Sequence, residues 1–382
     1  AAAAVDDLTK LVGVGPKASP RFSQLWLTTD KNGNGRCDAA WDAWLDANGN
    51  GRQDADEKAV GDFQLLSDMG INALRLFSGT VSGTTRYDTA SLDKALLREM
   101  HAKYGIMVVM GDFLGAYTHA SGASWKKGTD YTDAKQRRSM KECVRQMVLD
   151  LKDEPYILMW VLGNENNMKG DYTGVNATRT NAASQPEAYA KFLDEVATMI
   201  HEIDPDHPVA VGNVEINLAE YYAKYAPAID IFGVNSYRGG GGFGDLWKHV
   251  KRVFDRPVLI TEFGCDAYAE GKGVDEEAQR AYHENAVRDV VYNQAGGRYA
   301  GNAIGFLVFE YLDEWWKDTH SGDAENSHNK ASQFDMAFPD GRSHEEWLGV
   351  LGQGEGRNSP FERQPRSVYR WYCSIFGPPA TR

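Results

Sequence analysis

Long apolar runs are missing from this chain of 382 residues. No run approaches the roughly 18–20 apolar residues that a membrane-spanning helix needs, so no membrane span is expected. Cysteine is scarce as well, because the chain has only Cys37, Cys143, Cys265 and Cys373, which are widely spaced and form no CxxC pair. This spacing argues against a zinc site and leaves a disulfide open without indicating its partners.

A phosphate-binding glycine loop is also missing. The four glycines at 239–242 lack the GxGxxG spacing and follow a segment that ends in Tyr-Arg, so we interpret them as a flexible loop. The sequence therefore gives no sign of a nucleotide, and we expect no organic cofactor.

Positive charge is in deficit. Asp and Glu total 54 against 41 Lys and Arg, which gives a formal net charge of −13 at pH 7. Such a surface repels phosphate backbones and argues against a nucleic-acid partner, but not against a neutral substrate. Aromatic residues are plentiful, with 10 Trp, 18 Tyr and 15 Phe. Their faces either fill a core or stack on the C–H faces of sugars.

Short apolar segments alternate with amphipathic helical patterns along the chain. The segments expected to form strands are 11–16, 73–77, 106–113, 156–166, 208–215, 230–238, 257–264 and 303–311. The patterns after them predict helices at 61–69, 91–104, 133–152, 186–203, 218–225, 244–254, 276–294 and 365–375. Eight such units predict an α/β fold, a (β/α)8 TIM barrel, with residues 1–382 as one catalytic domain. A doubly wound sheet is the alternative, but it usually has fewer strands and a phosphate-binding glycine loop.

Two of the predicted strands end on a glutamate. The segment MWVLGNENN (159–167) is apolar up to Leu162 and then places Glu165 between amides, and PVLITEFG (257–264) carries Glu262 near its end. The carboxyl ends of barrel strands form the face where active sites are built. Two carboxylates that face each other there, roughly 5–5.5 Å apart, are the equipment of retaining glycoside hydrolysis.

These two segments resemble the acid/base and nucleophile signatures of glycoside hydrolase clan A. The segments GVNSYRG (233–239) and LVFEYLDEWW (307–316) resemble parts of family 2 barrels and of the family 72 β-1,3-glucan glucanosyltransferases. INALRLF (71–77) resembles the second strand of the clan, which carries an active-site arginine. The resemblance implies a catalytic barrel in which Glu165 is the general acid/base and Glu262 is the nucleophile.

The resemblance also implies roles for residues around these two acids. Asn164 is expected to bond the 2-hydroxyl of the sugar, a contact that strengthens towards the transition state. Tyr237 is expected to donate its hydroxyl to Glu262, and Arg75 to keep that nucleophile ionised. For Arg75 and Tyr237, the alternative is a role in bracing the barrel.

Other residues are expected to line sugar subsites. Trp315 or Trp316 would form the floor of the subsite where the sugar ring distorts, with hydrophobic plugging as the alternative. Further candidates on neighbouring strand ends or loops are Asp112, His119, Asn213 and Glu215.

An acidic, glycine-studded insertion, 30–57, follows the first predicted strand. Its second half fits the twelve-position loop of EF-hand calcium sites, with Gly51 at the sharp turn. The expected ligands there are the side chains of Asp46, Asn48, Asn50, Asp54 and Glu57 and the carbonyl of Arg52. The first half repeats the pattern with Trp41 at position twelve, where Asp42 is a possible substitute, and its expected ligands are Asp30, Asn32, Asn34, Arg36 and Asp38.

We interpret this insertion as a structural calcium site that stiffens one wall of the catalytic cleft. A solvated loop without an ion, a calcium switch and a docking module are the alternatives. Free calcium is scarce in cytosol, so the loops favour a secreted, periplasmic or cell-surface location.

The expected function is a retaining β-glycoside hydrolase that acts on a β-linked glucan or related oligo- or polysaccharide. A β-glucan transglycosylase is the first alternative, because it differs only in the acceptor that meets the glycosyl-enzyme. A non-catalytic carbohydrate-binding barrel is the second, although such a barrel should lack one of the two acids. A metal-dependent hydrolase is disfavoured because the strand ends hold no clusters of His and Asp.

Overall fold

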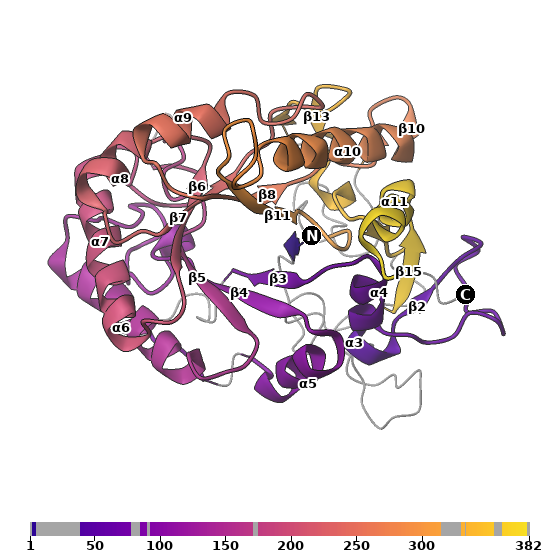
Figure 1. The fold of residues 1–382 in the computed structure, drawn as a ribbon, viewed down its shortest axis with the longest axis horizontal. Coiled ribbons are helices and arrows are strands. Elements are labelled where there is room, and N and C mark those ends of the chain that lie inside the picture. The colour runs from indigo at the N-terminus through magenta and orange to yellow at the C-terminus, as the bar shows by residue number, and fades with distance from the viewer. Residues whose placement is uncertain are drawn as a thin grey trace.

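The computed structural model describes residues 2–4, 39–77, 85–89, 92–170, 175–314, 330–332, 334–354 and 361–379. Its centre is a parallel sheet with helices around it (Figure 1). Seven strands follow one another in this sheet: β3 (Ala73–Leu76), β4 (Met107–Asp112), β5 (Ile157–Leu162), β6 (Val209–Val214), β7 (Ile231–Asn235), β8 (Val258–Phe263) and β11 (Ala303–Val308). Each lies within a strand predicted from the sequence, so these seven predictions are confirmed.

The first strand of the barrel differs from the prediction. The short strand β1 (Ala2–Ala4) pairs in parallel with both β11 and β3 and closes the barrel between them. The predicted strand at 11–16 lies outside the described residues, and the position expected for it is taken by β1. Alanines carry no strong strand pattern, whereas strand pairing itself uses backbone groups that every sequence has.

Most residues of the barrel strands are buried, on both faces of the sheet. All six residues of β8 and all five of β7 are buried. Strands that pack against helices outside and against each other inside need side chains that are apolar on both faces, which explains their continuous apolar runs. Glu262 is the one charged residue in β8, and its burial therefore requires polar partners.

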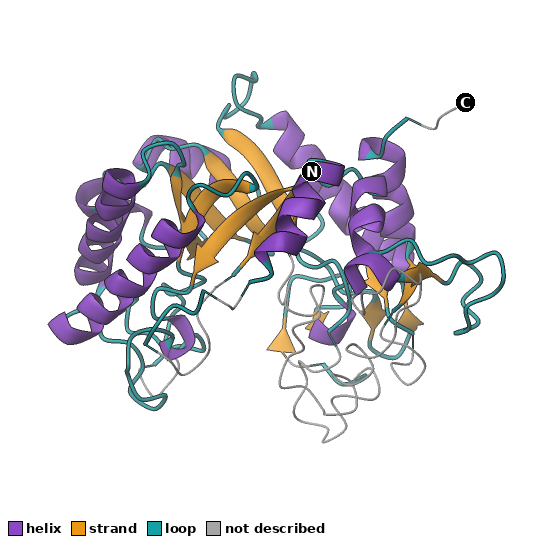
Figure 2. Cartoon of the chain, turned by 90° about the horizontal axis from the view of Figure 1, so that it is seen from below, coloured by secondary structure: helices purple, strands orange, loops and turns teal. Residues whose placement is uncertain are grey.

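The helices pack outside the strands, as Figure 2 shows. After the short α3 (Ala39–Asp42) they are α4 (Asp62–Asp68), α5 (Lys94–Tyr104), α6 (Ala134–Leu151), α7 (Pro186–Ile203), α8 (Ala219–Tyr225), α9 (Leu246–Val253), α10 (Glu276–Tyr292) and α11 (Ser367–Phe376). Asp93, Asp133 and Asp275 cap three of them by accepting hydrogen bonds from backbone N–H groups of the first turn. The eight helices α4 to α11 confirm the predicted helices, with ends that differ by a few residues.

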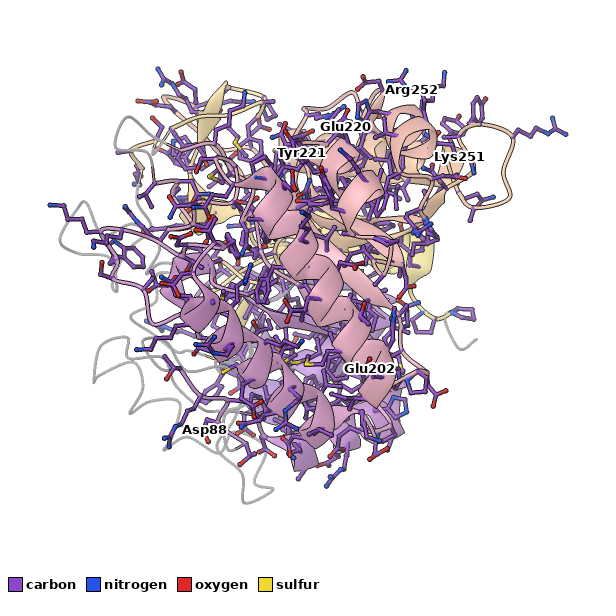
Figure 3. The ribbon with its side chains drawn as sticks, turned by 90° about the vertical axis from the view of Figure 1, so that its left-hand side faces the viewer. Asp88, Glu202, Glu220, Tyr221, Lys251 and Arg252 are labelled. Carbon is purple, nitrogen blue, oxygen red and sulfur yellow. The ribbon has the colours of Figure 1, made fainter. Side chains whose placement is uncertain are left out.

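The outer faces of these helices are polar. Figure 3 shows Glu202 on α7, Glu220 and Tyr221 on α8, and Lys251 and Arg252 on α9 at this outer face. The same helices turn their apolar residues towards the strands, as an amphipathic pattern predicts. Among the described residues no helix is both long and apolar enough to cross a membrane.

Several short elements decorate one side of the barrel. The strands β2 (Trp44–Leu45), β14 (Leu351–Gly352) and β15 (Glu362–Pro365) form a three-stranded sheet with β15 in the middle. Two short antiparallel pairs and two 3-10 turns complete the described elements: β9 (Tyr268–Ala269) with β10 (Gly273–Val274), β12 (Phe334–Asp335) with β13 (Arg342–Ser343), η1 (Ala116–Thr118) and η2 (Glu345–Trp347). Figure 1 places β2, β15, α3 and α11 on the same side of the molecule. The three-stranded sheet joins the insertion to the C-terminal part of the chain.

Candidate active site

The two glutamates predicted from the sequence line one pocket. Glu165 follows the end of β5, and Glu262 is the penultimate residue of β8. The pocket has a volume of about 660 Å³ and is also lined by Asn164, Asn235 and Tyr237. These residues come from the carboxyl ends of parallel strands, or from the residues directly after them, which explains why segments far apart in the sequence converge here.

A buried arginine ties the pocket together. Arg75, on β3, is 1% exposed, and its Nη1 lies 3.2 Å from Oε1 of Glu262. Nη1 also donates to Oδ1 of Asn235 at 3.2 Å and to the carbonyl of Thr261 at 2.9 Å. Nη2 donates to Oδ1 of Asn164 at 2.9 Å. A positive charge and a hydrogen bond both favour the ionised form of a carboxylate, so Arg75 favours Glu262 as an anion.

Asn235 connects the two glutamates. Its Nδ2 donates to Oε1 of Glu165 at 3.2 Å and to Oδ1 of Asn164 at 3.1 Å. Its Oδ1 accepts from Arg75 and from the hydroxyl of Thr261, which fixes the end of the amide that faces Glu165. Asn235 is not among the site residues predicted from the sequence. The available signal was its place within the sixth predicted strand, 230–238, two residues before Tyr237.

Tyr237 contacts the other oxygen of the second glutamate. Its hydroxyl donates to Oε2 of Glu262 at 3.1 Å. Burial, followed by the nearby charges of Glu262 and Glu165, raises the pKa of Tyr237 well above its ordinary value. The phenol therefore keeps its proton and acts as a hydrogen-bond donor. The two oxygens of Glu262 are thus held by different partners, Arg75 and Tyr237.

The backbone at Glu165 has a left-handed conformation, with a φ of 57°. Its N–H donates to the carbonyl of Gly212 at 2.9 Å, and the hydroxyl of Thr178 donates to its carbonyl at 3.1 Å. A Cβ at Gly212 would lie 2.2 Å from the carbonyl oxygen of Gly163, so glycine allows β6 to approach this turn. Strained backbone of this kind persists where the surroundings hold it, and here it fixes the loop that carries the carboxylate.

The amides around Glu165 brace this loop. Oδ1 of Asn166 accepts the N–H of Asn164 at 2.8 Å, and its Nδ2 donates to the hydroxyl of Tyr131 at 2.7 Å. Asn167 exchanges two hydrogen bonds with the backbone of Val214, at the end of β6. The polar residues after β5 therefore satisfy backbone groups of neighbouring strand ends and keep Glu165 in place.

Three residues predicted to line subsites do not line this pocket. Asp112 is 1% exposed, and its Oδ1 accepts the N–H of Leu114 at 2.7 Å, so it caps the turn after β4. Asn213 is fully buried and its amide donates to carbonyls of the turn after β6. His119 packs against Phe113, with ring centroids 4.8 Å apart. All three lie near strand ends, where their side chains brace loops or pack against them, and a role in further subsites stays a prediction.

The other subsite candidates have different outcomes. Glu215 does line the pocket, and its carboxylate accepts hydrogen bonds from Ser236 at 2.6 Å and from Nε of Arg238 at 2.8 Å. The predicted pair Trp315 and Trp316 lies outside the described residues.

The remaining wall of the pocket is mostly apolar or acidic. Its apolar part includes the aromatic and sulfur-containing side chains of Tyr117, Phe309, Phe334, Phe338, Met168 and Met336. The charged residues that line it, within the described ranges, are all acidic: Glu165, Glu215, Glu262 and Glu345. An anionic ligand would meet repulsion from this lining, so the pocket suits a neutral ligand better.

The second half of the insertion forms a tight loop. Oδ2 of Asp46 accepts the N–H of Gly51 at 2.9 Å, and Oδ1 accepts that of Gly49 at 2.8 Å. Both glycines have positive φ, at 71° and 72°. Oε1 of Glu57 accepts the N–H of Ala47 at 2.8 Å, so the ends of the loop are joined.

The donor set of this loop consists of oxygen atoms, as a calcium site requires. The amides of Asn48 and Asn50 both donate to Oδ2 of Asp54 at 2.8 Å, which gathers the polar side chains. Within the described ranges, no three His, Cys, Asp or Glu side chains form a group that could hold a metal ion. Calcium therefore stays a prediction, as does the backbone ligand Arg52. The ligands predicted in the first half lie outside the described residues: Asp30, Asn32, Asn34, Arg36 and Asp38.

One protein family matches the sequence of this chain. The family described as "Glycosyl hydrolases family 2, TIM barrel domain" matches residues 46–293. "Mannan endo-1,4-beta-mannosidase 2" of Oryza sativa subsp. japonica is 26% identical over 211 residues, which are 46% of this chain and 44% of that protein. The chain thus spans less than half the length of this relative. The likeness to family 72 inferred from the sequence is not shown by these findings.

Two solved structures share the fold. The structure of a β-D-glucuronidase of Dictyoglomus thermophilum has a TM-score of 0.51 at 18% identity, over 89% of this chain and 50% of that one. A family 1 β-glucosidase of Thermotoga maritima has a TM-score of 0.57 at 15% identity, over 83% of this chain and 86% of that one. At such identities the likeness shows the fold alone.

Proposed function

Because the chain belongs to the glycosyl hydrolase family 2 TIM barrel domain, we propose that it is a retaining β-glycoside hydrolase that forms a glycosyl-enzyme intermediate. The observation that carries this proposal is the network in which Asn235 and Arg75 join Glu165 to Glu262 within one pocket. A double displacement requires two carboxylates in one pocket, and different surroundings allow one to act as nucleophile and the other as acid/base.

The surroundings of the two acids support different roles. Glu262 is 7% exposed and receives hydrogen bonds from a cation, Arg75, and from the hydroxyl of Tyr237. These contacts favour the anion that a nucleophile must be. Glu165 is half-buried and receives the amide of Asn235, which carries no charge. An acid/base must be protonated in one step and ionised in the next, so a neutral partner suits Glu165.

The reaction then follows two displacements. First, one Oε atom of Glu262 attacks the anomeric carbon, the bond to the leaving oxygen breaks, and Glu165 gives that oxygen its proton. Next, Glu165 takes a proton from water, and the water oxygen attacks the anomeric carbon and releases Glu262 as a carboxylate. Because each step inverts the anomeric centre, the product keeps the β configuration of the substrate.

Asn164 is placed to bind the sugar. Its Oδ1 is occupied by Arg75 and Asn235, so its Nδ2 group is the end left for a sugar hydroxyl in the pocket. This supports the contact with the 2-hydroxyl, which is worth most when the anomeric centre gains positive charge.

For the substrate we propose a neutral β-linked polysaccharide, a mannan or a glucan. The acidic lining of the pocket supports neutral sugars over uronic acids, whose carboxylates would meet Glu215 and Glu345. The rice relative is named as a mannan endo-1,4-β-mannosidase. For this reason mannan comes first in the proposal, ahead of glucan.

Two variants test the assignment of roles. Glu262→Ala should lose activity on every substrate, by at least about 10⁴-fold, while substrate still binds. Glu165→Ala should lose activity on glycosides with poor leaving groups but keep far more on dinitrophenyl glycosides, because those leaving groups need no proton. The matched control is Glu220→Gln, on the outer face of α8 (Figure 3), which should behave as the wild type. Activity of Glu262→Ala within about tenfold of the wild type would refute the nucleophile assignment.

A substrate screen tests the second part of the proposal. Mannans, β-glucans and aryl β-glucuronides should be compared by kcat/KM, with the products sized by chromatography. Products longer than the substrate supplied would mean transfer to sugar instead of water. Faster turnover of glucuronides than of neutral glycosides would contradict the argument from the acidic lining.

A further inference from the structure

Two buried carboxylates meet where the insertion joins β15. Nε2 of Gln364 lies 3.2 Å from Oδ2 of Asp46 and 2.6 Å from Oε1 of Glu362, so both acids lie against one amide group. Asp46 is 1% exposed and Glu362 is fully buried. The parallel pairing of β15 with β2 brings these distant parts of the chain together.

The arginines of this segment pair with other acids. Arg363 gives its Nε and Nη2 to the carboxylate of Asp62, at 2.7 and 2.8 Å. Arg366 forms an ion pair with Asp313 at 2.6 Å. Oε2 of Glu362 is buried, and no hydrogen-bond donor reaches it from the part of the chain that the structure describes. A buried carboxylate pair of this kind requires a proton or a cation between its members.

A cavity of about 420 Å³ opens beside this pair. Its lining includes Gly49, Asn50 and Gly51 of the loop, Glu362 and Gln364 of β15, and the charged residues Glu276 and Arg366. The glycine turn of the predicted calcium loop and the buried acid of the strand therefore face the same space. The orphaned Oε2 of Glu362 is an observation independent of the sequence pattern of the loop.

We propose that Asp46 and Glu362 bind one divalent cation between them, so that a calcium ion clasps the 46–57 loop to β15. Carboxylate and amide oxygens are the donors that calcium prefers, and Asn50, which lines the same cavity as Glu362, offers an amide oxygen. An EF-hand loop takes all its protein ligands from its own twelve residues. Here one ligand comes from a strand near the other end of the chain.

The position of this clasp gives it a link to the catalytic pocket. Trp347 lines the cavity of the clasp, and Glu345 lines the catalytic pocket, and both belong to η2. An ion at Asp46 and Glu362 would therefore stabilise the segment η2, which forms part of one wall of the catalytic pocket. The proposal does not depend on the catalytic assignment, because it concerns metal binding and thermal stability.

The test uses the full chain, with calcium as the only ligand. Calcium should raise the Tm of the wild type by several degrees relative to EDTA, because it binds the folded state. Glu362→Gln should lose most of that rise and lower calcium affinity at one site by at least about tenfold in titration calorimetry. In EDTA the Tm of the same variant should equal or exceed that of the wild type, because the charge repulsion between residue 362 and Asp46 is removed. The matched control Glu202→Gln, exposed on α7 (Figure 3), should keep the full rise.

A second variant covers the case in which Glu362→Gln fails to fold. Gln364→Glu places a third carboxylate beside the pair, so its Tm should depend on calcium more strongly than that of the wild type. An unchanged calcium response in Glu362→Gln overturns the proposal, as does a wild type without any calcium response. If the Tm of Glu362→Gln exceeds that of the wild type by the same amount with calcium and with EDTA, the pair shares a proton. This result would also overturn the proposal.

Discussion

The barrel mouth and the junction of the insertion with β15 both bring acids close together, but they balance the charge differently. At the mouth, Arg75 supplies a cation that contacts Glu262 directly. At the junction, Arg363 is engaged with Asp62, and the pair of Asp46 and Glu362 shares only a neutral amide. A carboxylate paired with a cation of the same chain does not need an ion from the solution to balance its charge. A pair without one depends on protons or ions from the solution.

The largest effect should follow from removing the cation at the mouth. Arg75→Met leaves Glu262 buried without its charge partner, so the free energy of unfolding should fall by about 3–5 kcal/mol in denaturant titrations. We also expect kcat/KM to fall by at least about a thousandfold, because the proposed nucleophile loses the cation that favours its ionised form and holds its orientation. Arg75→Lys keeps the charge but not the planar fork, so it should recover stability more than activity. If Arg75→Met were as stable as the wild type, the proposed difference in charge balance between the barrel mouth and the junction with β15 would be wrong.

A smaller effect should follow from Tyr237→Phe. The raised pKa of Tyr237 keeps its proton in place across the assay range, so the hydroxyl acts as a donor to Glu262 throughout. Removing this donor disfavours the ionised carboxylate, and the acid limb of the kcat/KM profile should therefore move to higher pH. The value of kcat should fall about tenfold, which corresponds to about 1.4 kcal/mol. A profile that does not move would mean that the hydroxyl only fills space.

The smallest effect on the kinetics is expected from Glu215, the other acid in the pocket that is paired with an arginine. Glu215 is held by Arg238 and Ser236 on the side of β6 and β7, and the proposed mechanism gives it no role in the two displacements. Glu215→Gln should change KM by about two- to threefold and leave kcat unchanged. A loss of kcat like that of Glu262→Ala would show that the chemistry uses a different pair of carboxylates.

Most of the barrel was predictable from the sequence because its strands and helices have simple periodicities. Continuous apolar runs such as Ile157–Leu162 marked buried parallel strands, and the amphipathic helices were found with small errors at their ends. The strand at Ala2–Ala4 could not be found in this way, since alanine has little strand preference and the pairing is set by neighbouring strands.

The site was predictable at the level of strand ends but not of side-chain direction. Glu165 and Glu262 are recognisable in the sequence because an acid directly after a buried apolar run is costly unless it has polar partners. Asp112 and Asn213 occupy equivalent places, yet their side chains cap turns, which depends on local backbone conformation that a pattern does not contain. The role of Glu362 was hidden for a different reason, since only the pairing of β2 with β15 brings it to Asp46.

The central claim is that Glu262 forms a covalent bond with the sugar. A 2-deoxy-2-fluoro glycoside of mannose or glucose with a dinitrophenyl leaving group slows the second displacement more than the first and traps this intermediate. Intact-mass spectrometry should show one sugar per chain, and peptide mapping should place it on Glu262, with no label in Glu262→Gln. A label on another residue, or full turnover without any trapped sugar, would contradict the account.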